Sequence, residues 1–202
     1  MESLLLARHA FAGSNRDGVA SCAVPGEGLT AEGVEQAKRL GELLEAEVIS
    51  LGVASGLART QETLALALAG RSVPQLVLSE LNEIDFGAFA DGPLSTYRAW
   101  AGSQPPDEPA PGGGESRAEA AARFARGLRL LLERPEGLVL HIGHALAVRY
   151  VIDAAQGLVP APLMTPVEHA IAQRLHASDV GNAAALLDDW SRAPRFRDHS
   201  DG

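Results

Sequence analysis

The sequence has 202 residues, of which 46% are hydrophobic and 21% are charged. These values indicate a globular protein, and the length suffices for one domain with a sizeable core but not for two full domains. The formal net charge is −9. Electrostatic repulsion therefore disfavours nucleic acid and anionic membranes as partners.

The chain holds a single cysteine, Cys22, so no disulfide can form within it. A reducing environment is therefore expected. No apolar run approaches the roughly 20 residues that a membrane span needs, and the N-terminus lacks the basic and apolar regions of a signal peptide. We therefore expect a cytoplasmic protein.

The first half of the sequence alternates between predicted strands and helices. A short apolar run that stops at Arg8 is typical of a buried strand, and Thr30 is suited to cap the first long helix. After the first strand, residues 12–28 are rich in glycine and polar residues, which predicts a loop. The patterns predict strands over 3–7, 48–54 and 75–78 and helices over 30–47 and 58–69.

The second half begins with a segment rich in glycine and proline, residues 81–115, which we interpret as an insertion that covers the active site. Ser116 is suited to cap a long helix rich in alanine, arginine and leucine. The patterns that follow predict helices over 116–133 and 146–156, a strand over 137–142, and a pair of strands over 170–177 and 183–189.

This order of elements predicts an α/β fold, a three-layer sandwich with a mostly parallel central sheet and helices on both faces. Residues 1–190 would form a single domain, and residues 191–202 a C-terminal tail. In such sheets the functional site lies outside the carboxyl ends of the strands. Three predicted strands end there at groups suited to anion chemistry, namely Arg8-His9, Ser55 to Arg59, and His144.

His9 is the candidate nucleophile, because it follows a buried strand directly and has a cation beside it. A neighbouring arginine lowers the pKa of an imidazole by charge repulsion, and a nucleophilic imidazole must be neutral. Arg8 and Arg59 are suited to hold phosphoryl oxygens by paired hydrogen bonds, and His144 can donate another. His141 should point to the opposite face of its strand, and we interpret it as structural.

Glu83 is the candidate general acid, because cleavage of an ester requires a proton on the leaving oxygen. The apolar neighbours Ile84 and Phe86 predict partial desolvation of its carboxyl group. Spacing alone does not choose between Glu83 and the rival carboxylates Glu80, Asp85 and Glu115.

A metal centre and a nucleotide-binding loop are the competing interpretations of a phosphate-binding sequence. The chain has no pair of histidines at helical metal-binding spacing and no pair of cysteines. It also lacks the glycine-rich loop with Lys-Ser or Lys-Thr that cradles nucleotide phosphates. The sequence therefore favours neither a metal centre nor a nucleotide-binding loop of this type.

With these residues identified, the chain resembles the histidine phosphatase superfamily, also called phosphoglycerate mutase-like. The resemblance extends from residue 4 to about residue 189 and rests on several motifs in the family's order. The matching segments are LLLARHA, GLTAEGVEQAKRLG, SGLARTQET, LNEIDFGAFADG, GGGES together with Arg123, and LHIGHALAVR.

The resemblance implies that His9 attacks phosphorus and becomes a transient phosphohistidine. It also implies that Arg8, Arg59 and His144 hold the phosphoryl oxygens, with Asn15 nearby. Glu83 would protonate the leaving group and then activate water, with no metal or organic cofactor.

The partner implied is a small phosphorylated metabolite, and the oligomeric state is not predicted. Some positions depart from the family's pattern and bear on the substrate rather than on the reaction, notably Phe11-Ala12, Ala88 to Ala90 and Ala145.

Two alternatives to a phosphatase remain. The first is a phosphoglycerate-type mutase, whose acid motif usually reads Asn-Glu-Arg-His-Tyr-Gly. Here Glu83 is followed by Ile-Asp-Phe-Gly, which resembles the phosphatase branch.

The second alternative is a module that binds phosphorylated ligands without turnover, and the intact set of candidate catalytic residues argues against it.

Overall fold

A five-stranded sheet forms the centre of the structure, a computed structural model that describes residues 1–197. Its strands are β1 (Ser3–Arg8), β2 (Leu51–Ala54), β3 (Gln75–Val77), β4 (Leu138–Gly143) and β5 (Ala172–His176), arranged in the order β3-β2-β4-β1-β5. All neighbouring strands are parallel except β5, which runs antiparallel to β1. The predicted mostly parallel sheet is confirmed.

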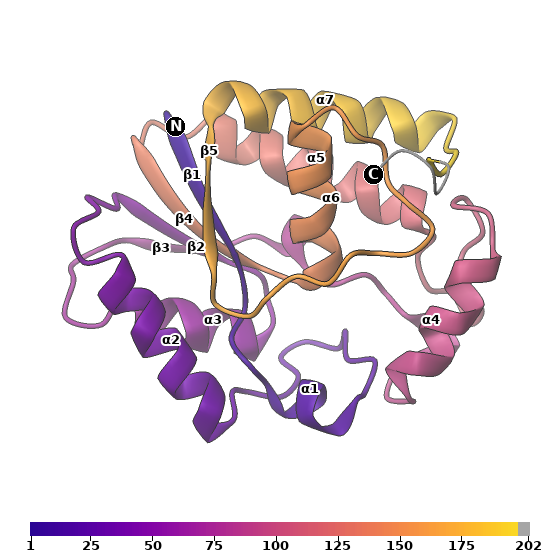
Figure 1. The fold of residues 1–202 in the computed structure, drawn as a ribbon, viewed down its shortest axis with the longest axis horizontal. Helices are drawn as coiled ribbons and strands as arrows, with labels where there is room; N and C mark the ends of the chain where they lie inside the picture. The colour runs from indigo at the N-terminus through magenta and orange to yellow at the C-terminus, as the bar shows by residue number, and fades with distance from the viewer. Residues whose placement is uncertain (198–202) are drawn as a thin grey trace.

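Helices cover both faces of this sheet (Figure 1). On one face lie α2 (Ala31–Leu43) and α3 (Ala58–Ala67), and on the other α5 (Arg117–Leu132), α6 (Ala145–Ala155) and α7 (Ala177–Arg192). The strands alternate accordingly: Leu4 and Leu6 of β1 belong to the core under α5, α6 and α7, whereas Leu5 and Ala7 pack with α2 and α3. The predicted three-layer α/β class is therefore confirmed.

The register of the parallel strands brings their carboxyl ends together. Arg8 of β1 pairs with Gly143 of β4, and Ala54 of β2 pairs with Ile142. The residues that follow these pairs therefore lie at one edge of the sheet, although they come from distant parts of the sequence. Short elements surround this edge, namely α1 (Gly13–Asp17), η1 (Ser79–Leu81), η2 (Gly87–Phe89) and α4 (Leu94–Ser103).

The helix α4 lies within the predicted insertion, at a place where the sequence analysis assigns no helix. It carries Tyr97 and Trp100, whose rings pack with those of Phe86 and Phe89 at centroid distances between 4.7 and 5.8 Å. Figure 1 shows α4 standing beside the sheet rather than on one of its faces. Its packing therefore rests on this aromatic cluster.

The prediction of a second late strand over 183–189 is wrong. Residues 177–192 form the single helix α7, and Gly181-Asn182 lies inside it instead of in a turn. Val180, Ala183, Ala184, Leu187 and Trp190 are buried along one side at helical spacing, a pattern that the interpretation as a strand pair overlooked. The Asp179 side chain also accepts a hydrogen bond from the backbone N–H of His176 at 2.9 Å, which helps to start the helix.

The described part of the predicted tail packs against the domain. The indole of Trp190 donates to the Arg195 carbonyl at 2.7 Å, and Arg197 forms an ion pair with Asp153 at 2.9 Å. The remainder of the predicted tail, residues 198–202, lies outside the described residues.

Two predicted boundaries differ in the structure. The first long helix ends at Leu43 instead of residue 47, and the second strand starts at Leu51 instead of residue 48.

The N-terminus of α2 packs closely against the chain that follows His9. Thr30 caps the helix by accepting from the Gly33 N–H at 3.1 Å, and its own N–H donates to the Phe11 carbonyl at 3.0 Å. A Cβ on Gly33 would overlap that carbonyl group, lying 2.9 Å from its carbon atom. Gly33 is therefore required by close approach of two backbones.

We expect Gly33→Ala to lower the free energy of unfolding by about 1 to 3 kcal/mol, because the added methyl displaces the backbone at Phe11. Gly181→Ala in α7 is the matched control, since nothing lies within 4 Å of its added Cβ. The control should raise stability by up to about 1 kcal/mol through helix propensity. Urea denaturation measures both, and equal effects of the two substitutions would contradict the packing argument.

Candidate active site

The candidate catalytic residues surround a cavity of about 290 Å³ at the carboxyl edge of the sheet. Arg8, His9, Asn15, Arg59 and Glu83 line it. His144 lies directly behind, with its ring centroid 5.4 Å from that of His9. The structure thus brings together every residue that the sequence analysis placed in the site.

His9 is held in one orientation by its surroundings. Its backbone N–H donates to the Gly143 carbonyl at 2.9 Å, which ties the end of β1 to β4. The ring Nδ1 lies 2.8 Å from the Ala10 carbonyl, and since a carbonyl can only accept, Nδ1 carries the hydrogen. The lone pair is therefore on Nε2, which receives a hydrogen bond from Arg59 Nε at 3.2 Å.

The His9 imidazole is neutral under ordinary conditions. Its side chain is almost fully buried, and burial lowers its pKa well below 6.5, with further lowering by the Arg59 charge. Nucleophilic attack requires a neutral imidazole whose lone pair is fixed in direction, and the hydrogen bond from Arg59 Nε fixes the lone pair of His9 Nε2. Both the hydrogen bonds to its ring and the lowered pKa therefore suit His9 to act as a nucleophile.

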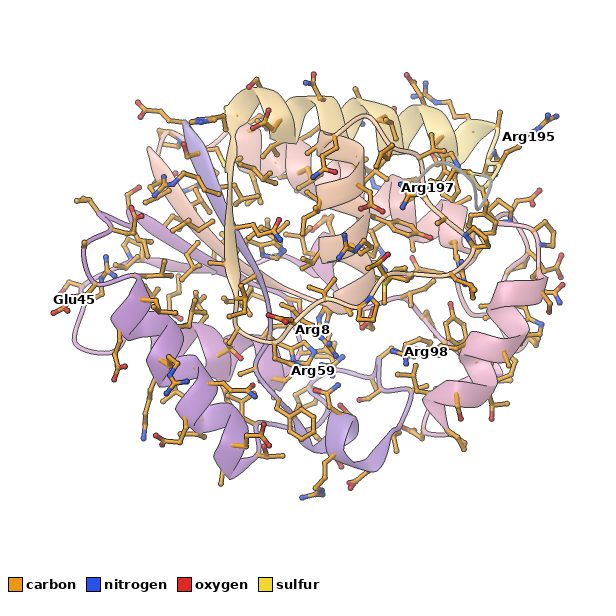
Figure 2. All side chains as sticks on the ribbon, viewed as in Figure 1. Arg8, Glu45, Arg59, Arg98, Arg195 and Arg197 are labelled. Atoms are coloured by element: carbon orange, nitrogen blue, oxygen red, sulfur yellow. The ribbon has the colours of Figure 1, made fainter. Side chains whose placement is uncertain are left out.

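Arg8 and Arg59 present buried donors to the cavity. Arg8 Nη1 donates to the Val167 carbonyl at 2.7 Å and Arg59 Nη2 to the Ser21 carbonyl at 2.9 Å. Arg8 Nε and Arg59 Nη1 are also buried and have no hydrogen-bond partner within residues 1–197. Burial lowers the pKa of Arg8 to about 10, so it remains charged at neutral pH. Figure 2 shows the two side chains side by side.

His144 is fixed by a chain of hydrogen bonds that leads into α3. Arg59 Nη2 lies 3.3 Å from His144 Nδ1, and a guanidinium can only donate, so this nitrogen is an acceptor. The opposite nitrogen, Nε2, therefore donates to Ser55 Oγ at 2.8 Å. Ser55 Oγ lies 2.9 Å from Thr60 Oγ1, which donates to the Leu57 carbonyl at 2.8 Å.

This tautomer bears on the predicted role of His144. Burial lowers its pKa well below 6.5, and the Arg59 charge adds to the effect. The Nδ1 atom, which lies near Arg59, must gain a proton before it can donate to a phosphoryl oxygen. Glu83 Oε2 lies 3.8 Å from it.

Glu83 is a largely buried carboxyl group, with 12% of its side chain exposed. Burial raises its pKa above 4.5, and the Arg59 charge opposes that shift. Arg123 holds the surrounding turn by donating to the carbonyls of Glu80, Asn82 and Glu83 at 2.9 to 3.2 Å.

The rival carboxylates are engaged elsewhere. Glu115 pairs with Arg123 at 2.6 Å and also accepts from the Asp85 N–H, while Asp85 accepts from the Gly87 N–H at 2.9 Å. Of the four candidate acids, Glu83 is the one that lines the cavity. Asn15 also lines it, with its Oδ1 accepting from the Ala12 N–H at 3.0 Å.

The residues at the site that the sequence did not indicate include His169 and Arg98. His169 stacks edge-on against His9 with a centroid distance of 5.6 Å, and Arg98 of α4 lines the cavity. Figure 2 shows Arg98 extending from α4 toward Arg8 and Arg59. The only signal for His169 was its position just before a strand, and Arg98 lies in a segment whose helix was not predicted.

Within the described part of the chain, no group of three or more histidine, cysteine, aspartate or glutamate side chains is placed to hold a metal ion. Among the same residues, no helix combines the length and the apolarity needed to cross a bilayer.

A buried histidine, paired guanidiniums and a second histidine meet at the carboxyl edge of a parallel sheet, an arrangement suited to bind a phosphoryl group. Residues 4–187 match the histidine phosphatase superfamily (branch 1), and the chain belongs to that family. This result confirms the resemblance seen in the sequence.

Relatives of known or assigned activity are similar to parts of the chain. An adenosylcobalamin/alpha-ribazole phosphatase of Escherichia coli K12 is 42% identical over 84 residues, which are 42% of this chain and 41% of that protein. The alignment thus spans less than half of the relative. The homologous protein of Salmonella typhimurium LT2 gives the same identity over the same length.

Solved structures extend the similarity over most of the chain. A putative alpha-ribazole-5'-P phosphatase from Escherichia coli K-12 superimposes with a TM-score of 0.76 at 28% identity, covering 87% of this chain and 90% of that one. A mycobacterial glucosyl-3-phosphoglycerate phosphatase gives a TM-score of 0.71 at 22% identity, covering 87% and 91%, and shares the fold.

The buried histidines should make stability depend on pH. His141 is buried with its Nδ1 3.3 Å from the Val53 carbonyl, and burial lowers its pKa to about 4. The unfolded chain binds a proton at this residue below about pH 6.5, whereas the folded chain does so only below about pH 4. Stability is therefore lost as the pH falls through this window.

We expect His141→Gln to remove about 3 kcal/mol of this pH-dependent loss between pH 6.5 and 4. Urea denaturation at a series of pH values measures it. His176→Gln, at an exposed histidine, is the control and should leave the pH dependence as in the wild type. An unchanged slope in His141→Gln would show that His141 is protonated equally in both states.

Proposed function

We propose that the protein is a metal-independent phosphatase that hydrolyses a small phosphomonoester through a phosphohistidine on His9. The observation that carries this proposal is the neutral, buried His9, whose Nε2 lone pair faces the guanidinium of Arg59. Arg8 and Arg59 line the same cavity, and each has a buried N–H group with no partner among the described residues. A phosphoryl group is the ligand that would satisfy these donors and accept that lone pair.

In the first step, His9 Nε2 forms a bond to phosphorus and the bond from phosphorus to the ester oxygen breaks. Arg8, Arg59 and Asn15 hold the phosphoryl oxygens, joined by His144 once it is protonated. The protonated Glu83 transfers its proton to the departing oxygen, which leaves as an alcohol. The raised pKa of Glu83 favours the protonated form that this step needs.

In the second step, the Glu83 carboxylate takes a proton from a water molecule whose oxygen attacks phosphorus. The bond from phosphorus to Nε2 breaks, and phosphate leaves with His9 restored as a neutral imidazole. Glu83 ends the cycle protonated, so the same group serves as acid and base in turn.

The walls of the cavity indicate the kind of organic group that the phosphate carries. Apolar side chains from several elements line it: Val19, Ile84, Phe86, Leu94, Leu146, Leu163, Met164 and Val167. Arg98 stands at the rim, exposed and without an ion pair among the described residues, and its charge contributes to lowering the pKa of Arg8. These features support a small metabolite with a partly apolar body, as the alpha-ribazole phosphatases among the relatives also do.

The mutase alternative has less support. The residues that follow Glu83 are Ile-Asp-Phe-Gly, which differ from the mutase pattern. Ile84 and Phe86 give the cavity an apolar wall beside the acid.

The cytoplasmic location expected from the sequence stays a prediction.

We expect His9→Ala to reduce hydrolysis of p-nitrophenyl phosphate by about a thousandfold or more, because no other histidine among the described residues lines the cavity. Wild-type protein quenched in alkali during turnover should carry one phosphoryl group on His9, detected by mass spectrometry. His176→Ala, at an exposed histidine, should retain full activity. Retention of turnover by His9→Ala would rule out the covalent route.

We expect Glu83→Gln to slow alkyl phosphates by about a hundredfold but p-nitrophenyl phosphate by less than about tenfold, because a good leaving group needs little protonation. The measurement is kcat for a series of esters that differ in leaving-group pKa. Glu80→Gln is the matched control, since Glu80 lies nearby but does not line the cavity. An equal loss for all esters would argue against Glu83 as the acid.

A further inference from the structure

A four-residue segment before β5, residues 167–170, holds the Arg8-His9 pair through three hydrogen bonds. The Val167 carbonyl accepts from Arg8 Nη1 at 2.7 Å, and the Ala170 N–H donates to the Arg8 carbonyl at 3.0 Å. His169 Nδ1 lies 2.8 Å from the His9 carbonyl. Figure 1 shows the loop that leads into β5 passing the end of β1.

The contact of His169 with the His9 carbonyl fixes the tautomer of His169. A carbonyl can only accept, so Nδ1 carries the hydrogen and donates it. Hydrogen bonds therefore hold both polar groups of the His9-Ala10 peptide. His169 donates to its carbonyl, and its N–H donates to Thr63 Oγ1 at 3.0 Å. The His9 ring in turn rests on the Ala10 carbonyl through Nδ1.

The ring of His169 also limits the motion of the His9 ring. The two imidazoles meet edge-on, with centroids 5.6 Å apart and planes at 65°. Phe11 supports His169 from another direction at 5.4 Å and 85°. The His9 ring also meets the His144 ring, with centroids 5.4 Å apart, so two imidazoles contact the proposed nucleophile.

The backbone at this segment adopts a conformation that costs free energy. Ala170 has φ of 53°, in the left-handed region that residues with a Cβ disfavour by about 1 kcal/mol or more. The hydrogen bond from its N–H to Arg8 helps to offset that cost. The turn at Ala170 is what lets β5 pair with β1 while His169 stays against His9.

We propose that His169 is a positioning residue for the nucleophile, holding His9 Nε2 in line with phosphorus through its hydrogen bond to the His9 carbonyl and its edge-on ring contact. The proposal rests on the proposed function. In-line attack needs the reacting atoms aligned, and a displacement of about 1 Å can cost about a hundredfold in rate. His169 itself does not bind the phosphoryl group in this account.

Three substitutions separate the two contacts. His169→Asn keeps an N–H donor at a reach similar to that of Nδ1, and His169→Phe keeps a ring but loses the donor. His169→Ala loses both. The experiment measures the single-turnover rate of phosphohistidine formation by rapid quench, with enzyme in excess over p-nitrophenyl phosphate, together with steady-state KM and thermal unfolding.

We expect His169→Ala to slow phosphohistidine formation by about tenfold to a hundredfold with little change in KM, because the phosphate-binding arginines remain. His169→Asn should recover most of the lost rate, and His169→Phe should fall between the two. His176→Ala is the control for loss of a histidine away from the site. If His169→Ala fails to fold, the comparison of His169→Asn with His169→Phe still separates donor from ring.

Phosphohistidine formation at the wild-type rate in both His169→Ala and His169→Phe would overturn the proposal. So would a loss of rate that simply follows the loss of thermal stability across the variants, since that marks a structural role. Absence of turnover in the wild-type protein would overturn the proposed function as well, whereas normal wild-type turnover with an unaffected His169→Ala would remove this inference alone.

Discussion

The guanidinium of Arg59 joins the two imidazoles of the site, and the arrangement of the other groups depends on that contact. Its Nε donates to His9 Nε2, and its Nη2 lies within hydrogen-bonding distance of His144 Nδ1. Because a guanidinium can only donate, both ring nitrogens present lone pairs to the same cation. An entering phosphoryl group would take over these donors and free His9 Nε2 for attack. The contact with Arg59 thus favours the neutral form of His9, the proposed nucleophile.

The protein keeps its cavity cations available by pairing them with neutral partners. Arg8 donates to the Val167 carbonyl and Arg59 to the Ser21 carbonyl. Burial lowers the pKa of both arginines, and the charge of Glu83 opposes that shift without forming an ion pair with either. Arg123 shows the contrasting solution, since its bidentate pair with Glu115 neutralises it and makes it a brace for the Glu83 turn. A strong ion pair at Arg8 or Arg59 would instead compete with the substrate phosphate.

Sequence patterns predicted the elements that carry strong periodicity and missed those fixed by long-range packing. The strand before His9 and the long helix after Ser116 were recognisable from apolar runs and caps, and both are present. The helix α7 is not predicted because Gly181-Asn182 is typical of a turn between two strands, whereas this pair lies inside the helix. The helix α4 was missed because its partners, Phe86 and Phe89, lie outside it in the sequence.

By itself, the sequence determined the class of fold and the identities of the groups that meet in the site. Those follow from local order: a strand, then Arg8-His9; a second strand, then Arg59; a later strand, then His144. Only the tertiary structure decided which carboxylate faces the cavity, which nitrogen of each histidine holds its hydrogen, and that His169 touches His9. These depend on distances between residues far apart in the chain, and neither periodicity nor spacing along the sequence encodes such distances.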